Sequence, residues 1–200
     1  MDDTDLPTVE MMMSTLQSSW NSRKQRSQAA AVDQHSTSKA AMASIHFVDN
    51  ADLEFIVGTG EEAVHFYASS MKVENAAPGL LATIIDYLQA DLNSARRFTC
   101  LPYVDATAFR ILMLVCHHQF DKMPRTIGFE ALHKLAEIMD QFDVASVLTP
   151  FSTQWLARLA EFEVDAAQPE WLLTSWIFGM QSLFTSCFGD IVNKTYLDDD

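Results

Sequence analysis

Residues 97–124 read RFTCLPYVDATAFRILMLVCHHQFDKMP, and changes of pattern divide this stretch into a strand, a helix and a loop. The segment RFTCLPYV (97–104) is rich in β-branched and aromatic side chains and contains Pro102, which is typical of a short strand that stops there. Asp105 follows at the position of a helix N-cap, where a carboxylate accepts hydrogen bonds from free backbone amides. The predicted helix has an apolar face at spacings of three and four residues, formed by Phe109, Leu112, Met113 and Cys116.

The end of this helix carries the segment CHHQFD (116–121), which contains four side chains of metal-binding type: Cys116, His117, His118 and Asp121. Consecutive helix residues project about 100° apart, so Cys116, His117 and His118 cannot close together on one ion. His117 and Asp121 would share a face if the helix continued, but the sequence nominates no further ligands. We interpret the segment as scaffold and predict no bound metal or cofactor; a metal site at Cys116–Asp121 is the alternative.

Upstream, the segments DLEFIVG (52–58) and AVHFYAS (63–69) are separated by the turn-like Thr59-Gly60-Glu61-Glu62, and together they predict a β-hairpin. The sequence Gly58-Thr59-Gly60 lacks the third glycine of a nucleotide-binding loop. A strand also follows it where such a loop needs a helix N-terminus. After Pro78, the segment GLLATIIDYLQADL (79–92) shows helical spacing and predicts one helix.

Downstream of Pro124 the pattern is helical throughout. One stripe comprises Leu132, Leu135, Ile138, Met139 and Phe142, and the next comprises Leu148, Phe151, Trp155, Leu156 and Leu159. Two further helices are predicted after Pro169, with Gly179 at the end of the first of them. The predicted fold class is therefore α+β, with a small N-terminal sheet formed by a hairpin and a third strand. This sheet packs with antiparallel helices, and a short helical extension follows.

Residues 1–46 are rich in Ser, Gln, Ala and Thr and hold few large apolar side chains. Such a composition cannot offset the entropy of ordering the chain, so we predict a disordered tail. The acidic start, MDDTDLPTVEMMM, lacks the positive charge of a signal peptide, and no apolar run is long enough to span a membrane.

The formal net charge of −14 would repel phosphate backbones and anionic lipid heads, so neither nucleic acid nor a membrane is an expected partner. The three cysteines, Cys100, Cys116 and Cys187, show neither CxxC spacing nor the density of a disulfide framework. Reduced thiols in a cytoplasmic or nuclear protein fit this pattern best. No Gly-x-Ser-x-Gly, HExxH or Walker motif occurs, and we do not expect an enzyme.

The ordered series of landmarks resembles the BTB/POZ family. The segment Asp52–Gly58 is similar to its first strand, while Phe66-Tyr67-Ala68, Val73 and Ala77-Pro78-Gly79-Leu80 have the spacing of its second strand and following helices. Residues 97–124 resemble the helix-to-loop segment of many fungal BTB proteins. Further landmarks are similar to those of the later helices: Asp140-Gln141-Phe142-Asp143, Pro150, Trp155-Leu156, Trp171-Leu172, Trp176 and Phe178-Gly179. The resemblance implies a BTB-like domain at 47–160 and a helical extension with an acidic tail at 161–200.

The resemblance implies a protein-interaction module whose partners are proteins, among them a cullin scaffold of a ubiquitin ligase and a client protein. Asp52, His117, Phe120 and Asp121 are the implied partner-interface residues. Self-association as a homodimer, or docking in transcription or nuclear organisation without a ligase role, is the alternative. Ser69 stands where the family usually has a histidine, and Ser70 stands where dimeric members often have a basic residue. Asp52 is therefore expected to lack its usual partner.

Overall fold

The computed structural model describes residues 43–90, 96–159 and 169–197. Its five-stranded sheet has the order β1-β3-β2-β5-β4, and the strands are β1 (Ala43–His46), β2 (Leu53–Val57), β3 (Val64–Ala68), β4 (Gln89–Ala90) and β5 (Arg97–Leu101). Strands β2 and β3 pair antiparallel through the 3-10 turn η1 (Gly60–Glu62), which confirms the predicted hairpin. Gly58 and Gly60 have φ of 88° and 63°, a region that glycine enters without steric cost.

Strand β1 lies within the stretch that the sequence predicted to be disordered, so the ordered part begins before residue 47. It pairs parallel to β3 at the edge of the sheet, from Ala43 opposite Val64 to His46 opposite Tyr67. Its sequence, ASIH, has one large apolar side chain, Ile45, which packs against the core, so the strand shows no hydrophobic alternation and is held mainly by backbone pairing with β3. Residues 1–42 lie outside the described part of the chain.

The chain crosses from β3 to β5 through the helices α2 (Ser70–Ala76) and α3 (Pro78–Ile84), followed by the 3-10 turn η2 (Ile85–Tyr87). Strand β5 then runs parallel to β2, with Phe55 opposite Thr99. The helix predicted over 79–92 is therefore wrong beyond Ile84. Residues 89 and 90 instead pair with β5 as β4, because tertiary backbone pairing overrides the local helical pattern. Residues 91 and 92 fall in a segment that is not described.

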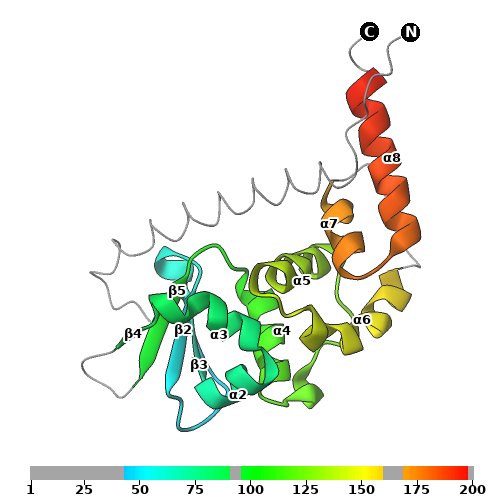
Figure 1. The fold of residues 1–200 in the computed structure, drawn as a ribbon. Helices are drawn as coiled ribbons and strands as arrows, with labels where there is room; N and C mark the ends of the chain where they lie inside the picture. Colours follow the sequence, from blue (N-terminus) through cyan, green and yellow to red (C-terminus); the bar gives the residue numbers. More distant parts are fainter. Residues whose placement is uncertain (1–42, 91–95, 160–168, 198–200) are drawn as a thin grey trace.

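Helix α4 (Ala106–Cys116) is the centre of the fold and packs against β3, α2, α5 and α6. The Asp105 carboxylate accepts a hydrogen bond of 2.8 Å from the Ala108 amide, which confirms the predicted N-cap. All four residues of the predicted apolar face are buried, and so are the intervening positions from Ile111 to Val115. In Figure 1, α4 lies between the sheet and the later helices.

After the 3-10 turn η3 (Phe120–Lys122), α5 (Phe129–Phe142) and α6 (Ala145–Leu159) cover the other side of α4. The predicted stripe of α5 is buried along its whole length, as are Leu148 and Trp155 of α6. These elements confirm the α+β class that was expected from the sequence. No helix in the described ranges is long and apolar enough to cross a membrane.

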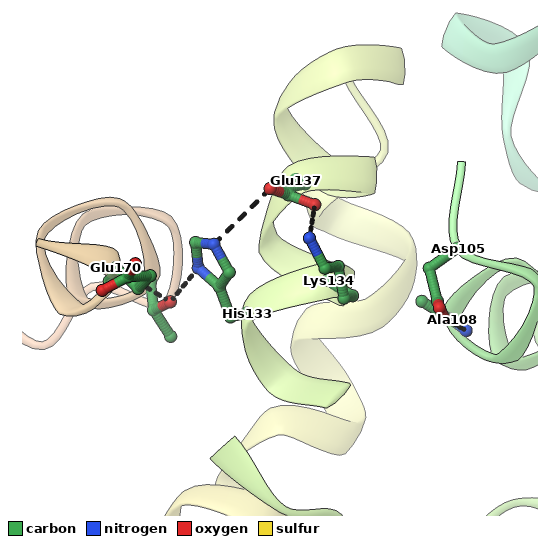
Figure 2. A network of polar contacts seen from close by, with 7 residues as sticks. Asp105, Ala108, His133, Lys134, Glu137 and Glu170 are labelled. Carbon is green, nitrogen blue, oxygen red and sulfur yellow. Dashed lines mark hydrogen bonds and ion pairs between the residues drawn. The ribbon is translucent and has the colours of Figure 1, made fainter. Parts of the chain in front are cut away.

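The last two helices are α7 (Glu170–Ile177) and α8 (Gln181–Leu197), and the turn between them contains Gly179 at a φ of 68°. Helix α7 docks on α5 through Trp171, whose ring centroid lies 4.0 Å from that of Phe129. A polar network beside this contact, shown in Figure 2, places His133 Nδ1 3.1 Å from the Thr174 hydroxyl oxygen. Glu137 contacts both His133 and Lys134 on the same face of α5. The domain boundary expected near residue 160 falls outside the described residues.

Candidate protein-interaction site

The start of α2 is fixed by the side chain of Asp52, which directly precedes β2. The Asp52 carboxylate accepts hydrogen bonds from the Ser70 backbone amide, at 2.8 Å, and from the Ser70 hydroxyl. Burial acts to raise the pKa of Asp52, but the hydrogen bonds from Ser70 outweigh it, and the pKa lies below its usual value. Asp52 was expected to lack the basic partner that is usual in dimeric members, and within this chain Ser70 satisfies the carboxylate instead.

His117 caps the end of α4 and holds the neighbouring amide of α2. Its Nδ1 donates to the Met113 carbonyl oxygen at 2.9 Å, and its Nε2 accepts from the Ser69 backbone amide at 3.1 Å. The ring stacks on Phe47 with centroids 5.1 Å apart, and the residue is 4% exposed. His117 was predicted to be a partner-interface residue, and this assignment is corrected: the side chain is an internal link between two helices.

The buried imidazole predicts an acid sensitivity of the fold. Burial lowers the pKa of His117 below 6.5, with the nearby Lys72 and His118 acting in the same direction. Above about pH 6.5 the imidazole is neutral in both states. Below that pH the unfolded chain binds a proton that the folded chain does not, so the free energy of unfolding should fall by up to about 1.4 kcal/mol per pH unit. Urea unfolding between pH 7.5 and 5.5 measures this slope.

The matched pair of variants is His117→Gln and His118→Gln, because His118 is the neighbouring histidine and its side chain is exposed. His117→Gln should lose stability at pH 7.5 and show a shallower acid slope, whereas His118→Gln should keep the slope of the parent. An unchanged acid slope in His117→Gln would contradict the neutral, hydrogen-bonded imidazole.

The arrangement at the end of α4 also bears on the metal-site alternative. The helix ends at Cys116, and His118 adopts a left-handed φ of 58°, so His117 and Asp121 do not share a helical face. Burial raises the pKa of the Cys116 thiol to about 12, which keeps it protonated at neutral pH. Both nitrogens of His117 are already hydrogen-bonded. Within the described residues, no group of three or more His, Cys, Asp or Glu side chains is arranged to hold a metal ion.

Phe120 and Asp121 lie at the surface, immediately after this turn. Phe120 is 48% exposed, and its ring centroid lies 5.7 Å from Phe151 of α6 and 5.8 Å from His118. Phe151 in turn lies 6.3 Å from Trp155, whose indole nitrogen donates to the Pro124 carbonyl oxygen at 3.0 Å. We call the surface formed by His118, Phe120, Asp121 and Phe151 the Phe120 corner. A buried tryptophan supports it from below.

The turn that carries the Phe120 corner is tied to the sheet by Gln119. Its side-chain amide donates to the Phe47 carbonyl oxygen at 2.9 Å, and its side-chain oxygen accepts from Lys122 Nζ at 3.0 Å. The structure thus brings Asp52 and His117 together at the start of α2 and places Phe120 and Asp121 on the surface beyond them. The sequence did not reveal the contacts of Ser69, Ser70, Phe47 and Phe151 at this site, because contacts across long sequence separations leave no local pattern.

No protein-family model matches the chain, and a search of curated proteins finds no match to it either.

Proposed function

We propose that the chain is a non-catalytic protein-interaction module of BTB/POZ type that acts in the cytoplasm or nucleus as a substrate adaptor of a cullin-based ubiquitin ligase. The landmarks of the resemblance support this proposal by their places in the fold. The segment Asp52–Gly58 contains the whole of β2, and Phe66–Ala68 is part of β3. The segment Ala77–Leu80 contains the first residues of α3. Strand β5 returns parallel to β2 and leads into the central helix, α4.

The observation that carries the proposal is the Phe120 corner. An exposed aromatic ring beside a carboxylate, held on a hydrogen-bonded turn, loses little conformational entropy when a partner covers it. Phe120 would fill an apolar pocket on the cullin, while Asp121 would face a basic side chain at the rim. The client would be held elsewhere, by the N-terminal residues or by α7 and α8.

The test is isothermal titration of the full chain against a cullin N-terminal domain. We expect binding at micromolar affinity or tighter, and Phe120→Ala should weaken it at least tenfold because the central aromatic contact is lost. Asp121→Lys should also weaken it, mainly through slower association. Tyr103→Ala is the matched control, since Tyr103 is 67% exposed and lies on the turn before α4.

If the titration showed no binding heat, the ligase role would be rejected. That result would favour the alternative, a self-associating or docking protein without cullin contact. Binding that survived Phe120→Ala and Asp121→Lys unchanged would keep the adaptor role but reject the Phe120 corner as the contact surface.

A further inference from the structure

The end of helix α4 is held by the first described segment of the chain. This segment consists of strand β1 and Phe47, and we call it the strap. The Phe47 amide donates to the Tyr67 carbonyl oxygen at 3.0 Å, which extends the pairing of β1 with β3 by one step. The Phe47 ring stacks on His117, and its carbonyl oxygen accepts from the Gln119 side chain at 2.9 Å. The strap therefore contacts the residues that lead from α4 toward Phe120.

The backbone between α4 and Phe120 adopts a conformation that needs support from outside. His118 has a φ of 58°, in the left-handed region that residues with a Cβ atom enter at a cost. The His118 amide donates to the Val115 carbonyl oxygen, and the Gln119 amide donates two residues further back in α4. These two bonds form a type of helix end that usually contains glycine. A strained backbone of this kind persists where surrounding contacts fix it, and the bond from Gln119 to the strap is such a contact.

The strap is weakly held compared with the strands inside the sheet. Among the described strands, β1 lies at the edge of the sheet and pairs with β3 alone. Three of its four residues are exposed, and Ile45 is the one that packs against the core. Phe47, which is 6% exposed, anchors the strap. Segments with few buried apolar contacts open at a lower free energy than the whole domain. We therefore expect the strap to leave the sheet while the rest of the fold stays intact.

We propose that the strap is a conformational switch for the Phe120 corner. The docked strap holds the corner in its binding geometry, and the detached strap releases it. This inference rests on the proposed function and adds a control to the same site. Detachment removes the acceptor of the Gln119 side-chain amide and the ring that covers His117, so the left-handed turn loses its support. Coupling between two sites is reciprocal, so a partner bound at the corner also keeps the strap in the sheet.

Hydrogen exchange of the full chain, followed at single amides by nuclear magnetic resonance, tests whether the strap and the turn open together. Ile45→Ser weakens the strap and should speed exchange of both the Phe47 and the Gln119 amides at least about tenfold, because one opening exposes both. Leu81→Ser on α3 is the matched control, since Leu81 is also partly buried against the core. Detachment of the strap leaves the contacts of Leu81 in place, so this variant should speed neither amide.

Two results of the exchange experiment would overturn the inference. Faster exchange of Phe47 in Ile45→Ser, with Gln119 unchanged, would show that the turn does not depend on the strap. Faster exchange of both amides in Leu81→Ser would show that they open only when the whole domain unfolds.

The variant Gln119→Glu cuts the link between strap and turn with little change of shape. The carboxylate keeps an oxygen for Lys122 but has no N–H to donate to the Phe47 carbonyl oxygen. In this variant the amide at position 119 should exchange faster than in the parent, and adding Ile45→Ser should not speed it further. The Phe47 amide should still respond to Ile45→Ser. Gln119→Glu also keeps the test decisive if Ile45→Ser does not fold.

The cullin titration shows whether the switch acts on binding. Gln119→Glu should weaken binding at least about fivefold while circular dichroism shows a folded chain, because the corner is no longer held in place. Gln181→Glu makes the same chemical change at an exposed position of α8 and should bind like the parent. A Gln119→Glu variant that binds as tightly as the parent would overturn the switch. If the parent does not bind, the proposed function is rejected, and the exchange experiment decides on its own whether the strap controls the turn.

Discussion

Replacing Leu135 by aspartate should leave the chain unfolded at 37 °C. Leu135 is fully buried on α5, within the stripe that packs against the central helix. Truncating such a leucine costs about 2–5 kcal/mol through lost transfer and packing energy. The buried carboxyl group has no hydrogen-bond partner there, which adds about 1–3 kcal/mol or more. The sum is comparable to the whole stability of a typical domain, about 5–15 kcal/mol.

Thermal unfolding followed by circular dichroism measures the effect of Leu135→Asp. Ser146→Asp is the matched control, because it places the same carboxylate at an exposed position in the first turn of α6. The control should change the free energy of unfolding by no more than about 0.5 kcal/mol. A Leu135→Asp variant that melted cooperatively at the temperature of the parent would show that the α5 stripe does not face the core.

Gly79→Ala should destabilise the fold by about 3 kcal/mol, although it adds one methyl group. A Cβ atom at Gly79 would lie 2.3 Å from the Phe142 carbonyl oxygen and 2.9 Å from the Asp143 carbonyl oxygen. Both atoms belong to the backbone at the end of α5, so no side chain can rotate away and α3 must shift as a whole. Overpacking of this kind typically costs about 1–3 kcal/mol, and rigid surroundings place this site at the upper end.

The matched control for Gly79→Ala is Gly189→Ala on α8, where a Cβ atom would meet nothing within 4 Å. That substitution should stabilise the chain by about 0.5–1 kcal/mol, because alanine is the better helix former. Urea unfolding of the two variants should therefore give shifts of opposite sign. Equal, small shifts would mean that α3 and α5 are not in close contact at Gly79.

The parts of the fold that the sequence predicts are those with local causes. Asp105 predicts the start of α4 because an N-cap side chain acts on amides two or three residues away. The buried stripe of α5 is predicted by its helical spacing. Strand β1 and the end of α3 at Ile84 could not be predicted from local sequence patterns. The backbone of β1 pairs with β3, and residues 89 and 90 after α3 pair with β5; the side chains of these short strands show no alternation that would reveal the pairing.

The same distinction between local and long-range causes applies to the residues of the candidate site. Phe120 and Asp121 were assigned to the partner interface by the resemblance, and the structure exposes both. His117 was assigned to the partner interface because the resemblance implies that the residue at the end of this helix faces the partner. Helix α4 is instead covered on several sides, and the Ser69 amide that meets His117 comes from a segment 48 residues earlier. Burial of that kind depends on which elements surround a helix.

The parallel pairing of β2 with β5 sets an order of events while the protein is being made. The hairpin of β2 and β3 can close as soon as Ala68 has left the ribosome, since its contacts are local. The other edge of β2 stays open until β5 emerges, about thirty residues later, which at cellular rates of translation is a delay of a few seconds. During that interval the future central strand of the sheet exposes unpaired backbone and its apolar residues. A nascent chain held at that length is thus the form most in need of a chaperone.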